Sequence, residues 1–227
     1  LGGIRPALEA VRQDAVTGLL SGDRHRGRGL QGGADASIRR MHVPPWITIR
    51  PLSYEDRLAP RAAGDVDLVV LHCTELPDLA MAREYGERIH NPDSGTGHCG
   101  HYYVDRDGAI EQWVSPLRVA HHVRGFNPRS VGIELVNSGR YPDWLDSRHQ
   151  WMHEPYPDLQ LAALDALLGH LRDTLPALQW IAGHEDLDTE EVPATDDPAL
   201  RVRRKRDPGV QFPWSRALAA SRLARLT

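Results

Sequence analysis

An aliphatic run that ends on a histidine is the feature that most constrains the fold of this chain. Residues 68–71 read Leu-Val-Val-Leu and lead directly into His72, and a second run, residues 130–136, carries Glu134 among branched aliphatic side chains. Runs of four to eight aliphatic residues are typical of strands that are buried on both faces. An unpaired charge inside such a strand is costly, so we expect a functional role for Glu134; the alternative is a glutamate that is salt-bridged at the sheet surface.

Strand and helix patterns alternate after Trp46. Helical spacing is found in residues 77–90 and 214–226, and a stripe of leucines predicts a helix over residues 159–175. Short strands are predicted at residues 100–104, 109–114 and 179–182, and the first two are joined by a turn that ends in Gly108. We therefore expect an α/β fold with a mixed sheet covered by helices, and residues 185–208 are expected to form a long polar loop.

Length and charge limit the function classes. With 227 residues, 41% of them hydrophobic, the chain can bury one ordinary core. The 27 basic and 31 acidic residues leave no basic excess, so we expect no nucleic-acid partner. No apolar stretch approaches the roughly 18 residues of a membrane span, and the first residues lack the pattern of a signal peptide. A soluble, cytoplasmic monomer is expected.

The first 40 residues differ in composition from the remainder. A possible helix over residues 6–20 is followed by a stretch rich in glycine and arginine without apolar periodicity, and Met41 resembles a natural start. We predict a dispensable, poorly ordered extension at residues 1–40 and a single domain over residues 41–227.

Two cysteines are too few for a disulfide scaffold and fit a reducing compartment. Cys73 directly follows His72, and consecutive residues of a strand point to opposite faces. The two side chains are therefore not expected to meet one metal ion, and we predict that Cys73 is a buried structural thiol.

Two histidines and an aspartate form the donor set of a catalytic zinc site with one open position. His72 ends the first aliphatic run, His184 follows a predicted strand, and Asp207 lies in Lys-Arg-Asp-Pro-Gly. Taken singly, His184 is more often a loop histidine among the twelve in this chain, and Asp207 is more often a turn former before proline.

Six ordered motifs together resemble the N-acetylmuramoyl-L-alanine amidases, in particular the cytoplasmic amidases that act on 1,6-anhydro-muropeptides. The resemblance covers roughly residues 46–216, and the motifs are, in order, Val-Val-Leu-His72, Gly-His-Tyr-Tyr-Val104 with Asp-Arg-Asp-Gly108, Ala-His-His122 with Asn127, Ser-Val-Gly-Ile-Glu134, Gly-His184 and Lys-Arg-Asp-Pro-Gly209. The resemblance implies an amidase or peptidoglycan-recognition fold and a Zn²⁺ ion held by His72, His184 and Asp207. It also implies a muropeptide substrate, cleaved between N-acetylmuramic acid and L-alanine during cell-wall recycling.

The resemblance also assigns roles to individual residues. Glu134 takes the place of the acid-base residue, and Lys205 that of a cation facing the developing oxyanion; a solvated basic loop is the alternative for Lys205. His122, Arg124 and Asn127 are candidate substrate contacts. The chain departs from the family at two positions: His121 stands where tryptophan is usual, and Gly100 stands where the phage enzymes carry a catalytic tyrosine. We do not transfer the role of that tyrosine to Tyr102 or Tyr103.

Two competing functions remain open at this point. The first is a non-catalytic module of the same fold that binds muropeptides, although such modules typically lack a ligand. The second is a zinc peptidase, for which the sequence contains no His-Glu-x-x-His motif. The aromatic residues of the connection 137–157 either line the cleft or anchor the loop.

Overall fold

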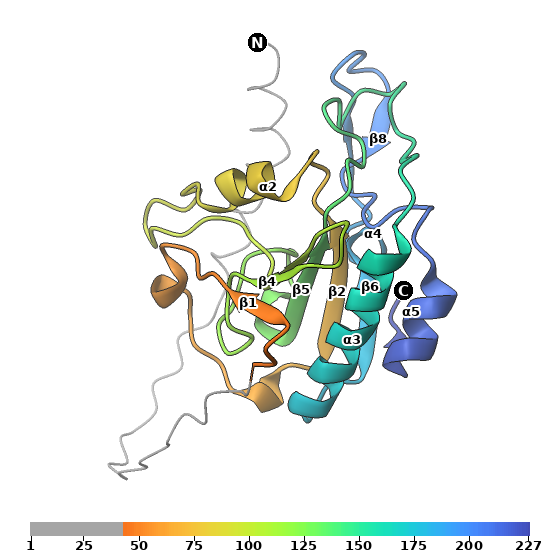
Figure 1. The fold of residues 1–227 in the computed structure, drawn as a ribbon. Helices are drawn as coiled ribbons and strands as arrows, with labels where there is room; N and C mark the ends of the chain where they lie inside the picture. Colours follow the sequence, from red (N-terminus) through yellow and green to blue (C-terminus); the bar gives the residue numbers. More distant parts are fainter. Residues whose placement is uncertain (1–42) are drawn as a thin grey trace.

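The structure is a computed structural model that describes residues 43–227, so the extension predicted for residues 1–40 lies outside the described part. A seven-stranded mixed sheet is flanked by helices (Figure 1), which confirms the predicted fold class. In chain order its strands are β1 (Ile47–Ile49), β2 (Leu68–Cys73), β3 (Tyr102–Val104), β4 (Ile110–Gln112), β5 (Ser130–Leu135), β6 (Trp180–Gly183) and β9 (Ala224–Arg225).

The two predicted aliphatic runs lie side by side at the centre of this sheet. The strand order is β1-β4-β3-β5-β2-β6-β9, and β2 pairs in parallel with both β5 and β6. β3 is parallel to β5 and forms the predicted hairpin with β4, in which Gly108 has the positive φ of 89°. All six residues of β2 are buried, which explains their continuous aliphatic character.

One face of the sheet is covered by α3 (Asp158–Thr174), the helix predicted from the leucine stripe (Figure 1). Its leucines at 161, 164, 167, 168 and 171 are buried against alternate residues of the central strands, and α5 (Trp214–Ser221) packs beside it. Cys73 belongs to this core and is only 4% exposed, so the prediction of a buried thiol on the face opposite to His72 is confirmed.

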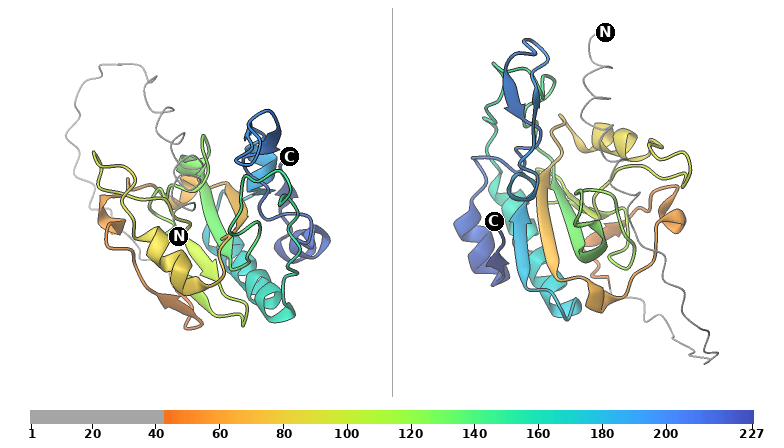
Figure 2. Two further views of the ribbon diagram at one scale, coloured as in Figure 1. Left: turned by 90° about the horizontal axis from the view of Figure 1, so that it is seen from above. Right: turned by 180° about the vertical axis from the view of Figure 1, so that it is seen from behind.

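The other face is covered by the segment before β5 and, over β3, by the helix α2 (Leu79–Gly86). Val123, from the segment before β5, packs on Leu68, Val70 and Ala182, and Figure 2 shows this segment in front of β5 in the view from behind. The segment ends in the short 3-10 helix η5 (Asn127–Arg129), and two others, η3 (Glu55–Arg57) and η4 (Ala63–Asp65), precede β2.

Three predicted elements differ from the structure. α2 (Leu79–Gly86) is shorter than residues 77–90, because Asp78 caps it by accepting a hydrogen bond from the Met81 amide at 2.7 Å. The stretch 185–208 is not a plain loop: it contains α4 (His184–Leu187) and a ribbon of β7 (Glu191–Pro193) and β8 (Arg201–Arg203). The last helix ends at Ser221, since Arg222 adopts a left-handed conformation and the chain then forms β9.

The carboxyl ends of β2, β5 and β6 meet at one edge of the sheet. His72 lies near the end of β2, Glu134 near the end of β5, and His184 directly after β6. Ligands bind at this edge in open α/β sheets, so the fold itself brings these three residues to one place. No helix among residues 43–227 is long and apolar enough to cross a membrane.

Candidate active site

The three predicted metal ligands converge at the carboxyl edge of the sheet. His72 Nδ1 lies 3.0 Å from His184 Nδ1 and 2.9 Å from Asp207 Oδ2, and the third distance, between His184 Nδ1 and Asp207 Oδ2, is 3.1 Å. All three residues are buried. Among the described residues, they form the one group of histidine, cysteine and acidic side chains whose ligand atoms lie close enough for a metal ion.

This triangle of donor atoms fits zinc. A triangle with edges of 3.0 Å has its centre about 1.7 Å (3.0/√3) from each corner, less than the zinc-ligand distance of about 2.0 to 2.1 Å. One ion could therefore be held by all three atoms, and it would keep a further position open for water or substrate. Asp207 Oδ1 is a buried oxygen without a hydrogen-bond partner in the described chain, as expected of a carboxylate that is completed by a cation.

The electrostatics of His184 and Asp207 agree with metal binding. Burial lowers the pKa of His184 to about 3, although Asp207 opposes the shift, so its imidazole is neutral and has a lone pair to share. For Asp207, burial acts to raise the pKa, but His184 and His72 hold it well below its usual value. A neutral imidazole and an ionised carboxylate are the forms that bind a metal.

Local backbone contacts set the positions of His184 and Asp207. His184 is the first residue of α4, and the amide of the next residue, Glu185, donates to the carbonyl of Asp207 at 2.9 Å. Arg203, in the strand β8, donates to the carbonyl of Glu185 at 2.6 Å. The loop that carries Asp207 is therefore tied to the helix that carries His184.

Glu134 lies beside the ligand triangle. It pairs in register with His72 on the neighbouring parallel strand, so the two side chains leave the same face of strands that lie about 4.8 Å apart. Burial raises the pKa of Glu134 to about 7, although His72 and Lys205 act to lower it. Gly100 packs against this side chain, because a Cβ at position 100 would lie 2.7 Å from Glu134 Cγ.

Lys205 lies in the same electrostatic environment, two residues before Asp207. Burial lowers the pKa of Lys205, and the carboxylates of Asp207 and Glu75 oppose that shift. The same lysine acts to lower the pKa of Glu134, so the structure brings the two predicted catalytic side chains within electrostatic reach of each other. Their catalytic roles remain proposals.

The side chains of all three candidate substrate-binding residues form hydrogen bonds or ion pairs with other groups of the protein. Both ring nitrogens of His122 have partners, His72 Nε2 at 3.0 Å and Ser130 Oγ at 3.2 Å. The Asn127 side-chain oxygen accepts from the amides of His122 and Val123 at 3.0 and 2.8 Å. It therefore shapes the segment that holds His122.

Arg124 forms ion pairs with two acidic residues that precede β7. It pairs with Glu190, and its guanidinium lies 3.7 Å from Asp188 Oδ1. Asp188 is also paired with Arg204. Arg124 therefore links the connection before β5 to the chain around β7 and β8, and a substrate contact for it remains a prediction.

A buried ion pair between Arg140 and Glu75 was not predicted from the sequence. Arg140 binds both carboxylate oxygens of Glu75 at 2.7 and 2.9 Å, and it donates to the carbonyls of Arg203 and Arg204 at 2.9 and 3.2 Å. Glu75 adopts a left-handed φ of 48°. The pair thus joins the loop after β2 to the two residues that precede Lys205.

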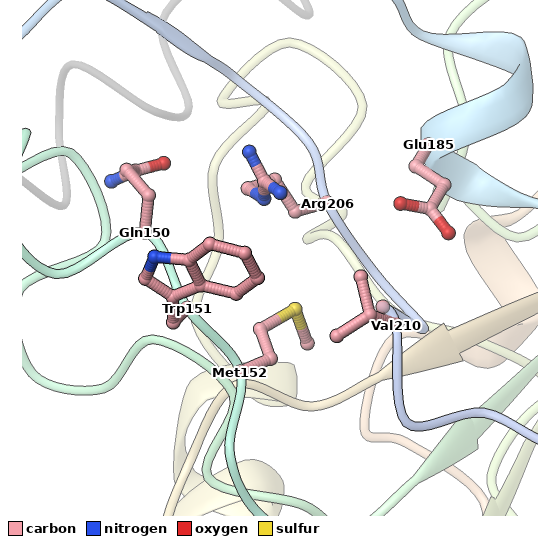
Figure 3. A pocket seen from close by; sticks show the side chains of 7 residues that line it. Gln150, Trp151, Met152, Glu185, Arg206 and Val210 are labelled. Carbon is pink, nitrogen blue, oxygen red and sulfur yellow. The ribbon is translucent and has the colours of Figure 1, made fainter.

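A crevice is formed partly by residues that neighbour the metal ligands in the sequence. It is lined by residues adjacent to His184 and Asp207 in the sequence and by the connection 137–157 (Figure 3): Gln150, Trp151, Met152, Glu185, Arg206, Gly209 and Val210. A second, open cavity of about 210 Å³ shares Trp151 and is also lined by Arg148, His149 and His153.

The aromatic residues of the connection 137–157 divide between the two predicted roles. Trp144 and Tyr156 are buried anchors, with the indole N–H donating to the Glu75 carbonyl at 3.1 Å and the phenol donating to the Pro208 carbonyl at 2.6 Å. Trp151 is 65% exposed and lines both the crevice and the cavity. Tyr141 is half-buried and lines the second cavity, so Trp151 is the most exposed of the four aromatic side chains and the one most available to a substrate.

The sequence profile of the N-acetylmuramoyl-L-alanine amidases matches residues 62–210, which include the ligand triangle, Glu134 and Lys205. The chain belongs to this family. Over 96 residues it is 30% identical to an endolysin of Enterobacteria phage K11, an alignment that covers 42% of this amidase-family chain and 58% of the endolysin. The chain thus spans little more than half the length of that relative.

Solved structures of amidases share the fold. The endolysin amidase LysCS from Clostridium intestinale URNW superposes with a TM-score of 0.56 at 20% identity, covering 82% of this chain and 100% of LysCS. The amidase AmiD from E. coli, in complex with the substrate anhydro-N-acetylmuramic acid-L-Ala-D-γ-Glu-L-Lys, superposes with a TM-score of 0.53 at 22% identity, covering 73% and 61% of the two chains. At this identity the likeness supports the fold alone.

Proposed function

We propose that this protein is a zinc-dependent amidase that hydrolyses the bond between N-acetylmuramic acid and L-alanine in muropeptides. The observation that carries the proposal is the buried triangle of His72, His184 and Asp207 beside Glu134, in a chain of the amidase family. When bound there, the ion supplies Lewis-acid activation of water and of the amide carbonyl.

Glu134 acts as the proton carrier in this proposal. Its carboxylate removes a proton from the attacking water and returns it to the amide nitrogen as the carbon–nitrogen bond breaks. A pKa of about 7 suits both steps, because a carrier whose pKa lies near the working pH accepts and releases a proton at comparable cost. Gly100 leaves the space in which this side chain lies.

Lys205 stabilises the charge that develops during the attack. Its ammonium faces the negative charge on the carbonyl oxygen of the tetrahedral intermediate, where a cation in a poorly solvated site has a large effect. The buried pair of Arg140 and Glu75 holds the carbonyls of the two preceding residues and so restricts the backbone that carries Lys205. These residues provide positioning, charge stabilisation and proton transfer.

The substrate class is a soluble muropeptide, with the 1,6-anhydro form as its finer definition. The AmiD complex contains an anhydro-muramyl peptide, and the sequence motifs resemble the cytoplasmic enzymes of cell-wall recycling. We therefore include cytoplasmic recycling in the proposal. The phage endolysin relative favours a second candidate, hydrolysis of the intact wall.

Digestion of a substrate panel tests the proposal. The zinc-loaded chain is incubated with an anhydro-muramyl tripeptide, its reduced non-anhydro counterpart, intact sacculi and the free tripeptide, and the products are identified by mass spectrometry. We expect release of the stem peptide from the anhydro-muropeptide, loss of activity with a zinc chelator, and recovery on adding Zn²⁺. Cleavage that persists without metal would contradict the proposal, as would failure to cleave any muramyl substrate.

The same panel separates the competing functions. A non-catalytic muropeptide-binding module would retain the substrate in equilibrium dialysis without releasing product. A general zinc peptidase would cleave the free tripeptide, which contains no muramic acid. A preference for sacculi over the soluble anhydro-muropeptide would replace the recycling role with a wall-degrading one.

A further inference from the structure

One nitrogen of each imidazole in the ligand triangle is directed toward the metal position, and the other nitrogen of His72 faces His122. The His72 Nε2 to His122 Nδ1 distance is 3.0 Å, and the two rings meet edge to face at an interplanar angle of 86°. A neutral imidazole has one N–H and one lone pair. The hydrogen-bond partner of Nε2 therefore decides whether Nδ1 of His72 has a lone pair for a metal.

The direction of the hydrogen bonds around His122 is set by a backbone carbonyl. The Ser130 hydroxyl donates to the carbonyl of Phe126 at 2.8 Å, and a carbonyl can only accept. Having used its single hydrogen, Ser130 Oγ accepts from His122 Nε2–H at 3.2 Å. His122 Nδ1 is then an acceptor, so it receives the Nε2–H of His72.

The rigid surroundings of His122 hold this chain of hydrogen bonds in place. Its ring lies against Gly132, where a Cβ would be only 2.6 Å from His122 Nδ1. Asn127 fixes its backbone amide, and Ser130 is fully buried. Three alternate residues of β5 thus serve the site: Glu134 is the proposed acid-base residue, Gly132 lies under the ring of His122, and Ser130 supplies the terminal hydroxyl.

We propose that His122 and Ser130 are positioning residues that fix His72 as the Nε2–H tautomer and so direct the lone pair of its Nδ1 at the metal. This inference rests on the proposed zinc site, and it replaces a direct substrate contact as the role of His122. Partners of this kind, beyond the ligands themselves, orient a ligating histidine and raise its basicity, and their loss typically weakens metal binding about 10- to 100-fold.

A matched pair of substitutions isolates the acceptor. Asparagine and leucine have nearly the same shape, and the amide oxygen of asparagine takes the place of the imidazole Nδ1. We expect His122→Leu to weaken Zn²⁺ binding about 10- to 100-fold in a chelator competition at pH 8, and His122→Asn to stay within a few-fold of the unmodified chain. Ser130→Ala, which removes the terminal acceptor, is expected to lie between them.

A second readout observes the tautomer itself. In the zinc-loaded protein with ¹⁵N-labelled histidine, long-range ¹H–¹⁵N spectra distinguish the protonated ring nitrogen from the unprotonated one. We expect His122 to be protonated at Nε2 and unprotonated at Nδ1 in the unmodified chain, and to populate both tautomers in Ser130→Ala. A purely structural role would instead lower the thermal stability of the leucine and asparagine variants without separating them in Zn²⁺ affinity.

The outcomes separate this inference from the proposed function. If the unmodified chain binds no Zn²⁺, the proposed zinc site fails. If it binds Zn²⁺ but His122→Leu binds equally tightly, or His122 is protonated at Nδ1 in the zinc-loaded chain, the positioning role is overturned and the zinc site stands. If His122→Leu does not fold, the tautomer of the unmodified chain and the affinity of Ser130→Ala still decide.

Discussion

Replacing Arg140 with methionine removes the cation of the buried pair and keeps most of the side-chain volume. The guanidinium makes five hydrogen bonds: two to Glu75, two to the carbonyls of Arg203 and Arg204, and one to Gln150. The side chains of Arg140 and Glu75 are 1% and 9% exposed. The substitution therefore leaves an ionised carboxylate and two carbonyls in a site that water scarcely reaches.

Removing one partner of a buried ion pair destabilises a protein by about 3 to 5 kcal/mol. Five hydrogen bonds at a net value of about 1 kcal/mol each give about 5 kcal/mol. Since native domains are stable by about 5 to 15 kcal/mol, the variant is expected to be marginally folded at room temperature.

Urea denaturation of the variant and a matched control tests this reasoning. Arg148 lies in the same connection, but its side chain is 72% exposed, so Arg148→Met is expected to unfold at the same urea concentration as the unmodified chain. The double variant Glu75→Gln/Arg140→Met removes the stranded charge and is expected to recover part of the loss. A destabilisation below about 1 kcal/mol for Arg140→Met would refute the account of this pair.

Further predictions concern the reacting groups. Glu134→Gln is expected to retain Zn²⁺ and to lose about 100-fold or more in kcat, as measured by mass spectrometry of the released peptide. Burial raises the pKa of Glu134 to about 7, so the protonated side chain contributes fully to the stability of the metal-free protein below the unfolded pKa. This contribution is lost as pH rises through 7. The difference in unfolding free energy between this chain and Glu134→Gln, measured in urea, should fall over the same pH range. Gly100→Ala places a Cβ 2.7 Å from Glu134 Cγ and should lower kcat without changing zinc content. Gly169→Ala, where no described atom outside the helix itself lies within 4 Å of the new Cβ, should leave kcat unchanged. Trp151→Ala should raise KM for the muropeptide with little change in kcat, and Trp46→Ala, an exposed tryptophan outside the crevice, should change neither constant.

The strands at the centre of the site were predictable because buried strands have recognisable sequence patterns, namely aliphatic runs and side chains that alternate between the two faces. The same alternation placed Cys73 and His72 on opposite faces with Cys73 buried, and the structure confirms this by placing Cys73 in the core under α3. The ribbon β7–β8 was missed because its three-residue strands are charged, and one contains proline. Such segments carry no apolar period by which a strand is recognised.

Contacts between segments that are distant in the sequence could not be predicted from it. The pair of Glu75 and Arg140 joins residues 65 positions apart, and nothing local to either residue indicates its partner. The hydrogen bond between His122 and His72 was not predicted from the sequence, because the position of His122 behind His72 follows from the space above Gly132. That space exists only after β2 and β5 have paired.

Anomalous diffraction at the zinc absorption edge tests the central claim most directly. Crystals of the protein grown with Zn²⁺ are expected to show one strong peak within bonding distance of His72 Nδ1, His184 Nδ1 and Asp207 Oδ2, and crystals of Asp207→Ala are expected to lose it. A well-occupied zinc peak elsewhere in the molecule, with none between these three atoms, would contradict the account.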